Sequence, residues 1–192
     1  TLDLGLYSAN RGTSIPGGII SVADMATLRI AGTNSFPTNY LTHTLSVNST
    51  IEYYGNNQTV TNENYGNLIL SGTLGAVVKT LPSTALNIRG SFTSTIGTAT
   101  SVTCTALNSI TVSQNATIGT GTTFNASSFT HTFSDTVTIN GTFSGNTSTT
   151  IFAGDNALIS GIGSINFYTI NVTGIGVIIA GTSNVTIAGN LT

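Results

Sequence analysis

Charged side chains are scarce in this chain of 192 residues. Only 5% of the residues are charged, the formal net charge is −2, and Lys and Arg together number four. A surface that binds nucleic acid needs many basic side chains to neutralise phosphates, so this composition excludes nucleic acid as a partner. Mean hydropathy is +0.29, which argues against disorder, because such a chain has apolar surface to bury and little charge repulsion to keep it open.

Cysteine and long apolar runs are also missing. Cys104 is the single cysteine, which excludes an internal disulfide framework and a cysteine-based metal site, and we expect it to be buried as a small apolar residue. No apolar run approaches the roughly 20 residues that span a bilayer, so we expect no membrane insertion. We expect a processed or excised segment, because the chain opens on Thr1 without Met. Scarcity of charge and cysteine together fit an extracellular or cell-surface location.

What the sequence does contain is a recurring pattern of alternating apolar and polar residues, followed by glycine or a small polar residue and then by a polar and an apolar residue. It is clearest as "LNIRGSF" (86–92), "VTINGTF" (137–143) and "VTIAGNL" (185–191). A period of two, rich in Val, Ile and Thr, predicts β-strands, and no segment carries a sustained helical stripe. The single Asn-Gly pair, Asn140-Gly141, lies inside one of these phrases rather than between two strands, which disfavours simple hairpins.

A longer repeat relates the two halves of the chain. "STIEYYGNNQTVTNENYGNLILSG" (49–72) is answered by "TTIFAGDNALISGIGSINFYTINVTG" (149–174). The offset is 100 residues between Ile51 and Ile151, and 102 residues between Tyr65 and Phe167. Repetition of a pattern with different letters indicates repetition of a structural unit.

These patterns predict an all-β fold, a right-handed parallel β-helix (β-solenoid) with coils of roughly twenty residues, because strands on neighbouring coils then pair with one another. An antiparallel β-sandwich is the alternative that the same alternation allows. We expect residues 1–192 to form one module, a unit of a longer chain or fibre. The side chains expected to point inward are Leu45, Val47, Leu68, Leu70, Leu86, Ile88, Ile110, Val112, Val137, Ile139, Ile170, Val172, Val185 and Ile187.

Residues 17–72 resemble a repeat of very large secreted surface proteins of Bacteroidota, in which a "TLxIGGTNxFP" phrase is followed by "STVEYNGxxQTV" and "YGNLTLSG". The corresponding phrases here are "TLRIAGTNSFP", "STIEYYGNNQTV" and "YGNLILSG", with Ala31 where glycine is commoner. The resemblance covers about the first ninety residues and continues loosely to Thr192. It implies a β-solenoid segment of an adhesin-like or filament-forming protein at the cell surface, with no catalytic residues to carry over.

Catalysis and metal binding are not expected. Polysaccharide-cleaving solenoids need clustered carboxylates, and the six here are scattered, so that only two pairs can lie on adjacent coils, namely Glu52 with Glu63 and Asp135 with Asp155. His43 and His131 occur in matching phrases, "LTHTL" and "FTHTF", and we expect both to be outward polar positions about four coils apart, too far apart for a metal pair. We therefore expect no enzyme, no metal and no cofactor.

Sugars enter the prediction in two ways. Bacteroidota modify the hydroxyl in Asp-Ser/Thr followed by a small apolar residue, and "DTV" (135–137) makes Thr136 the best glycosylation candidate. An alternative function is a polysaccharide-binding module with a face of Thr, Asn and Tyr that includes Tyr53, Tyr54 and Tyr65. Exposed tyrosines on successive coils would favour binding, and buried tyrosines would favour a structural role.

The two ends of the chain carry the main functional prediction. The first residues, "TLDLGL", and the last, "VTIAGNLT", both resemble strands and include no helical cap or cluster of charges. We expect the end of one unit to pair with the start of a following unit, either a second copy or an adjoining repeat. The residues expected in this end-to-end interface are Thr1, Leu2, Asp3, Leu4, Val185, Ile187 and Leu191.

Overall fold

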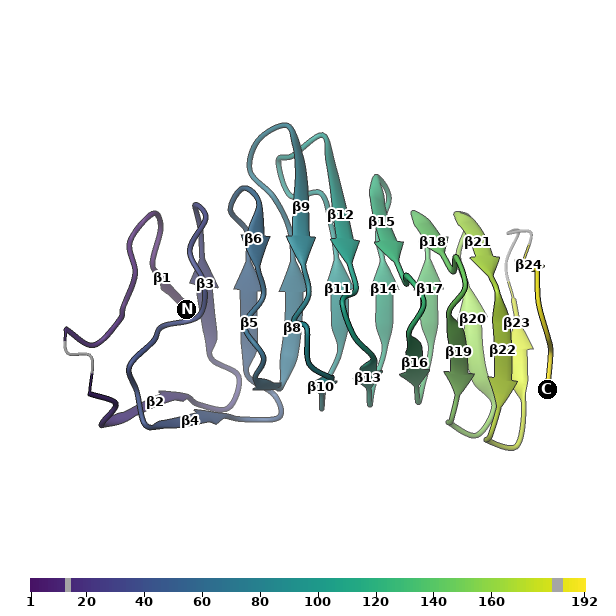
Figure 1. Cartoon of the computed structure of the whole chain (residues 1–192), viewed down its shortest axis with the longest axis horizontal. Helices are drawn as coiled ribbons and strands as arrows, with labels where there is room; N and C mark the ends of the chain where they lie inside the picture. Colours follow the sequence, from purple (N-terminus) through teal and green to yellow (C-terminus); the bar gives the residue numbers. More distant parts are fainter. Residues whose placement is uncertain (13–14, 181–184) are drawn as a thin grey trace.

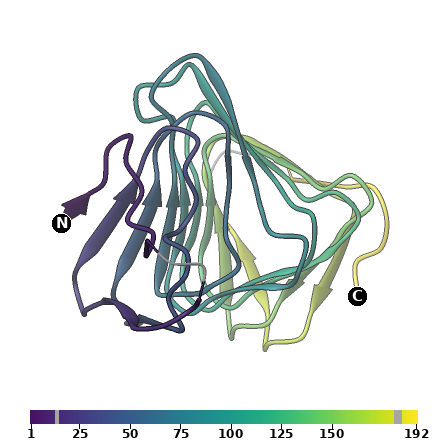
Figure 2. The same cartoon turned by 60° about the vertical axis from the view of Figure 1, so that its left-hand side comes forward.

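The computed structural model describes residues 1–12, 15–180 and 185–192. In these residues the regular elements are all β-strands, and they form a parallel β-solenoid of about 8 turns with about 21 residues per turn. The coils stack along the long axis of the molecule, with the N-terminus and the C-terminus at opposite ends (Figures 1 and 2). The predicted fold class is therefore confirmed. Because the strand pairs are parallel, the antiparallel sandwich is excluded.

Three long sheets form the sides of the solenoid. Sheet A contains β1 (Leu2–Asp3), β3 (Thr27–Ile30), β5 (Thr50–Tyr53), β8 (Asn67–Leu70), β11 (Phe92–Ser94), β14 (Ala116–Ile118), β17 (Val137–Ile139), β20 (Ala157–Ser160) and β23 (Val177–Ile179). Sheet C contains β6 (Gln58–Thr59), β9 (Ala76–Thr80), β12 (Ser101–Thr105), β15 (Thr122–Asn125), β18 (Thr142–Ser144), β21 (Ser164–Phe167) and β24 (Val185–Ile187). Sheet D contains β7 (Asn64–Tyr65), β10 (Leu86–Ile88), β13 (Ile110–Val112), β16 (Thr130–Phe133), β19 (Thr149–Phe152) and β22 (Thr169–Val172).

The first two coils are less regular. In these coils β2 (Ile19–Val22) precedes β3, and β4 (Thr42–Leu45) precedes β5. β2 and β4 pair with each other as a separate two-stranded sheet, sheet B. Residues 31–41 contain no strand, so sheet C begins only at β6. This late start leaves a hollow beside β6.

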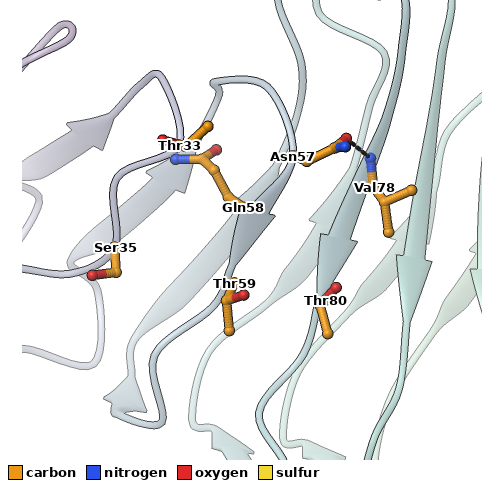
Figure 3. A pocket seen from close by; sticks show the side chains of 7 residues that line it. All are labelled: Thr33, Ser35, Asn57, Gln58, Thr59, Val78 and Thr80. Carbon is orange, nitrogen blue, oxygen red and sulfur yellow. Dashed lines mark hydrogen bonds between the residues drawn. The ribbon is translucent and has the colours of Figure 1, made fainter.

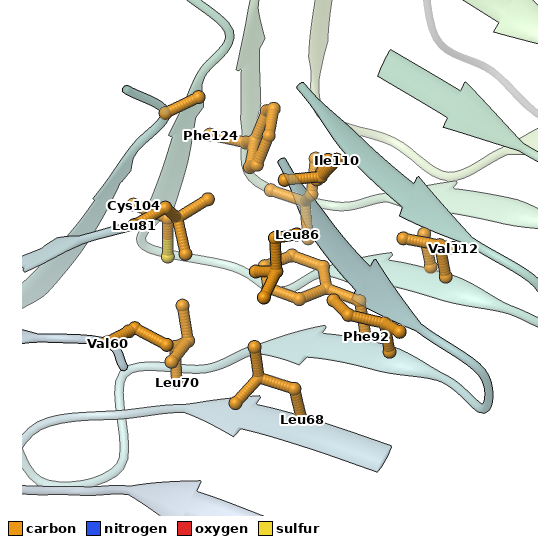
Figure 4. Close-up of a cluster of buried hydrophobic side chains, with 14 of the residues drawn as sticks. Val60, Leu68, Leu70, Leu81, Leu86, Phe92, Cys104, Ile110, Val112 and Phe124 are labelled. Atoms are coloured by element: carbon orange, nitrogen blue, oxygen red, sulfur yellow. The ribbon is translucent and has the colours of Figure 1, made fainter. Parts of the chain in front are cut away.

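The core is built from columns of inward side chains, one residue per coil. In sheet A one column runs through all nine strands as Leu2, Leu28, Ile51, Leu68, Phe92, Ala116, Val137, Ile159 and Ile179. In sheet C the column is Gln58, Lys79, Cys104, Phe124, Phe143, Ile165 and Val185. Figure 4 shows such side chains meeting inside the solenoid. Parallel pairing at a fixed register places equivalent side chains over one another, so each coil buries apolar surface against both neighbours.

Most of the predicted inward set is buried, including Leu70, Ile88 and Ile139. The prediction is wrong for Val47, which is 40% exposed. Strand β4 ends at Leu45, and a turn closed by the Ser49 N–H donating to Ser46 O follows, so the period of two does not continue to Val47. The inward residues of the last coils are only partly buried, namely Val172, Val185 and Ile187. Cys104 is buried as expected.

The repeated phrases occupy different sides of the solenoid. The segment at 86–88 is β10 in sheet D, that at 137–139 is β17 in sheet A, and that at 185–187 is β24 in sheet C. Likewise, the central residues of "YGNLILSG" form β8 in sheet A, whereas those of "FYTINVTG" form β22 in sheet D. The unit that repeats in the sequence is therefore one strand with its following turn, about a third of a coil.

The glycine that ends the phrase is required by close packing between coils. A Cβ atom placed on Gly141 would lie 2.2 Å from Thr122 O and 2.4 Å from Gly119 O, in the backbone of the preceding coil. A Cβ on Gly90 would lie 2.8 Å from Gly66 O in the same way. Neighbouring strands are only about 4.8 Å apart, so a corner that presses backbone onto backbone has no room for a side chain.

Candidate functional site

The first end of the solenoid has an open edge and an apolar hollow. Among the residues that the structure describes, strand β1 pairs with β3 on one side only. Leu2 is 60% exposed, whereas Leu28, the next residue of its inward column, is 4% exposed. A hollow of about 310 Å³ opens at this end, lined among others by Leu2, Ile20, Val22 and Leu28. Thr1, Asp3 and Leu4 lie in the same terminal coil, as the sequence predicts. The core is thus accessible from this end.

The last end is open in the same way. Strand β23 pairs only with β20, and β24 only with β21, in the described residues. Ile179 is 56% exposed, although Ile159 below it in the inward column of sheet A is 1% exposed. Leu191 is 66% exposed and extends sheet D through a parallel bridge to Ile170. Within the described residues, no further coil covers these side chains.

The structure brings the predicted interface residues to the two ends but places them in different sheets. β1 belongs to sheet A, whereas Val185 and Ile187 lie on β24 in sheet C. In the last coil the strand that shares sheet A with β1 is β23. A following unit that continues sheet A would therefore set its β1 against β23, a strand that sequence reasoning did not include in the interface. The clue lies in Val177–Ile179, an apolar run at the expected coil spacing.

An ion-pair ladder ties the first coil to the next two on the outer face of sheet A. Arg29 donates to Asp3 Oδ2 at 2.6 Å and to Glu52 Oε2 at 2.7 Å, and its guanidinium lies 4.1 Å from the ring centroid of Tyr54. The Tyr54 hydroxyl donates to Asp3 Oδ1 at 2.6 Å and, together with the Gly5 N–H and Arg29, lowers the pKa of Asp3. Because β1 has only two residues, this ladder helps to hold the end strand in place.

The two histidines are not outward positions, so that prediction is wrong. His131 is fully buried; its Nδ1 accepts from the Ile110 N–H at 3.3 Å, its Nε2 donates to Ala126 O at 2.8 Å, and burial lowers its pKa. His43 is half-buried, with Nδ1 2.7 Å from Glu63 Oε1 and the ring 5.3 Å from that of Phe36. A neutral imidazole whose nitrogens both have partners can replace an apolar residue in the core, which explains the inward place of His131.

A cleft of about 250 Å³ lies where sheet B gives way to sheet D. It is lined among others by His43, Glu63 and Arg89. Arg89 bridges the break by donating through Nη2 to the carbonyl oxygens of Leu45 and Asn64. The two nitrogens His43 Nε2 and Arg89 Nε are buried, and neither has a hydrogen-bond partner in the described part of the chain. The cleft is therefore a joint between two sheets, stabilised by the hydrogen bond between His43 and Glu63 and by Arg89.

The remaining carboxylates also have structural partners. Glu52 accepts from Ser71 Oγ at 2.8 Å as well as from Arg29, whereas Glu63 contacts His43. The two carboxylates therefore have different partners. Asp135 accepts from the Thr136 N–H at 2.8 Å, and Asp155 accepts from the Ile175 N–H at 3.1 Å. Across the described ranges, no three His, Cys, Asp or Glu side chains are grouped so as to hold a metal ion.

Thr136, the glycosylation candidate, lies in the turn before β17. It is partly exposed, and its hydroxyl is 3.4 Å from Asp135 Oδ1. Its backbone oxygen accepts from the Ala116 N–H of the preceding coil. The Thr136 hydroxyl is thus at the surface, on a turn whose backbone is hydrogen-bonded to the preceding coil.

In the part of the chain that the structure describes, no helix could cross a membrane.

Sequence reasoning missed a buried lysine. Lys79 is fully buried in the inward column of sheet C, where Nζ donates to Gly55 O at 2.9 Å, Asn56 O at 2.8 Å and Gln58 Oε1 at 2.5 Å. Burial lowers the pKa of Lys79 to about 8, and the same burial raises the pKa of its neighbour Cys104 to about 12. The signal was present in "AVVKT", where the period of two gives Lys79 the same inward parity as Val77.

This lysine predicts a particular pH dependence of stability. The folded-state pKa of about 8 lies below the ordinary 10.5, so from pH 8 upward the unfolded chain holds a proton that the folded chain has lost. Stability therefore rises with pH in that window. Above the ordinary Cys pKa of 9.0 the unfolded thiol ionises while the folded one does not, which opposes the rise. We expect the free energy of unfolding to increase between pH 8 and 9, level off, and fall above 10.5.

The measurement is chemical denaturation at a series of pH values, with Lys79→Met as the comparison. The variant has no lysine to titrate, so its stability should be flat between pH 8 and 9 and fall above 9. Identical profiles for both proteins would show that Lys79 does not titrate in this range.

A second, polar hollow opens on the outer side of sheet C, where that sheet begins (Figure 3). Its volume is about 380 Å³. Thr33 and Ser35 line it from the strandless segment of the second coil, Asn57 and Thr59 line it from β6 and the turn before it, and Thr80 lines it from β9. The hollow exists because the second coil provides no strand to pair with the free edge of β6.

The tyrosines of the alternative function do not form a face. Tyr53 and Tyr65 are fully buried, with their hydroxyl oxygens 3.0 Å apart, and burial raises the pKa of both. Tyr54 is partly exposed and is engaged by Asp3 and Arg29.

Comparison of the chain with protein-family models, curated proteins and solved structures found no match.

Proposed function

We propose that this chain is a non-catalytic structural module of an extracellular fibre or cell-surface adhesin, in which units stack end to end through β-strand pairing. The observation that carries the proposal is the pair of uncovered ends: Leu2 and Ile179 are the end members of one inward column, and both are more than half exposed. A column that is buried along its length and uncovered at both ends is completed by another unit of the same cross-section.

Strand direction and chemistry support head-to-tail stacking. All pairs in sheet A are parallel, so β23 of one unit and β1 of the next can pair in the same sense as every other neighbour. Burying an exposed Leu or Ile side chain stabilises by about 1.5–3 kcal/mol, and each joint would bury Leu2, Ile179 and part of the apolar hollow. Such a heterologous contact does not close on itself, so repeated stacking gives an open fibre.

The setting of the proposal comes from the sequence. Scarcity of charge and cysteine and the resemblance of residues 17–72 to surface repeats support an extracellular or cell-surface location. Burial of Tyr53 and Tyr65 removes the aromatic platform of the binding alternative and favours the structural role. The carboxylates are engaged with neighbouring groups rather than gathered in a groove, which supports the absence of catalysis.

The test is whether the chain assembles through its ends. We expect electron microscopy and sedimentation velocity to show particles that lengthen with protein concentration. Leu2→Lys and Ile179→Lys should each give single units, because a charge at the end of the inward column cannot be buried without a partner. Leu74→Lys is the matched control, since Leu74 is 77% exposed in the turn before β9 and far from both ends, and it should assemble like the parent chain.

Two results would contradict the proposal. One is a parent chain that remains a single unit at every concentration. The other is a loss of assembly in the Leu74→Lys chain as large as that in the two end variants, because this would indicate a general effect of added charge. Both end substitutions replace side chains that are already exposed, so the fold of the single unit should be retained, which circular dichroism can check.

A further inference from the structure

The polar hollow beside β6 contains several hydrogen-bonding groups without a protein partner. In the described residues, the hydroxyls of Thr33, Ser35, Thr59 and Thr80 make no hydrogen bond to another protein group, and all four line the hollow. The Asn57 side chain uses only its Oδ1, which accepts from the Val78 N–H at 2.8 Å, and this bond fixes the side chain with its NH2 group unused (Figure 3). Four hydroxyls and one amide thus surround a hollow of about 380 Å³.

The hollow has no charge at its surface. None of the residues that line it is ionisable. Lys79, on the strand that forms one wall, turns its ammonium group inward to Gly55 O, Asn56 O and Gln58 Oε1. An anion would find no cation here, and a metal ion would find no carboxylate or imidazole. The matching ligand is neutral and carries many hydroxyl groups of its own.

The polar lining continues along the solenoid. Thr59 and Thr80 begin an outward column of sheet C whose next members are Thr105, Asn125, Ser144 and Asn166, one on each coil. Neighbouring strands are about 4.7–4.9 Å apart. A pyranose residue in an extended glycan advances by nearly the same distance, so a glycan laid along the solenoid axis would meet one hydroxyl or amide side chain for each sugar.

We propose that the hollow and this column form a binding site for a neutral polysaccharide, with one sugar residue in the hollow and the chain running along sheet C. The hydroxyls of Thr59 and Thr80 and the Asn57 amide make the hydrogen bonds at the hollow. No exposed aromatic ring lines the hollow, so binding rests on hydrogen bonds and is weak for one module. A fibre that presents the site on every unit gains avidity, but the site itself does not depend on stacking.

The experiment is an NMR titration of the isotope-labelled chain with neutral hexasaccharides of glucose, mannose, xylose and N-acetylglucosamine, and with hexagalacturonate as an anionic probe. The Ile179→Lys chain is used if the parent assembles. We expect amide shifts confined to residues that line the hollow and to the sheet C column, with at least one neutral probe. The double variant Thr59→Val/Thr80→Val should weaken that binding about tenfold, because two hydrogen bonds are lost while the β-branched shape remains.

The matched control is Thr93→Val/Thr117→Val, which removes two outward hydroxyls from neighbouring coils of sheet A and should leave the affinity unchanged. Ser35→Ala is a second test in an exposed, strandless segment, where loss of the side chain does not threaten the fold. Four results would overturn the proposal: no shifts with any neutral probe at millimolar concentration, shifts on another face, preference for the anionic probe, or equal weakening in the sheet A control. Capture of an extended peptide at β6 in place of sugars would assign the hollow to strand addition instead.

Discussion

Phe143→Ala is expected to lower the free energy of unfolding by about 3–5 kcal/mol, the range for removal of a fully buried aromatic ring. Phe143 is 0% exposed on β18, in the middle of the inward column of sheet C. Its ring is stacked 5.5 Å from that of Phe124 and tilted 4.8 Å from that of Phe167, measured between centroids. Truncation leaves a cavity between coils that neither neighbour can fill, because the backbone ladders on both sides fix their positions.

Thr142→Ala provides the control on the same strand. Thr142 faces outward and is partly exposed, so its loss should change stability by no more than about 0.5 kcal/mol. Denaturant unfolding followed by far-UV circular dichroism compares the two variants with the parent chain. Similar losses at the two positions would contradict the assignment of Phe143 to the inward face and Thr142 to the outward face of β18.

Gly141→Ala is expected to destabilise the chain by about 1–3 kcal/mol, as overpacking does, even though it adds a single methyl group. The new Cβ would lie 2.2 Å from Thr122 O, so either that backbone or the corner itself must move. Movement at one corner disturbs the register on which the columns of the next coil depend. The measurement is again the free energy of unfolding, together with the amide spectrum of the neighbouring coils.

Gly176→Ala is the matched control for this corner. A Cβ at Gly176 meets no heavy atom within 4 Å, and the backbone there needs no left-handed conformation. We expect this substitution to be neutral or slightly stabilising, because alanine restricts the unfolded chain. A loss of stability at Gly176 as large as that at Gly141 would argue against close packing as the reason why glycine recurs in the repeated phrase.

The alternation of residues predicted the facing of most of the apolar residues in the expected inward set, with Val47 as the exception. In β17, for example, Val137 and Ile139 are inward and Thr138 is outward, as the period of two requires. The fold class followed because the strands recur at coil spacing without hairpin turns. The side of the solenoid on which each strand lies could not be predicted, because turn lengths vary: paired residues are 17 apart from Ile51 to Leu68 and 24 apart from Leu68 to Phe92.

The candidate sites were harder to predict, for two physical reasons. Residue type suggested that His131 points outward, and no facing was predicted for Lys79, but hydrogen bonds to backbone oxygens and side chains satisfy both inside. Position in the strand was the better guide in both cases. The polar hollow depends on the absence of a strand in residues 31–41, which exposes the edge of β6, and that absence is a property of how two coils fit together.

The opposite positions of the two chain ends have a mechanical consequence. Each terminus belongs to the outermost coil, so a pull through the ends of a single unit peels coils one after another, and only a few hydrogen bonds resist at any moment. When a neighbouring unit pairs with each terminal coil, the outermost strands are no longer free to peel, and the same pull is shared along the continuous ladder of sheet A. A single unit should therefore extend in small steps at low force, whereas a stacked fibre should hold until it breaks at a joint.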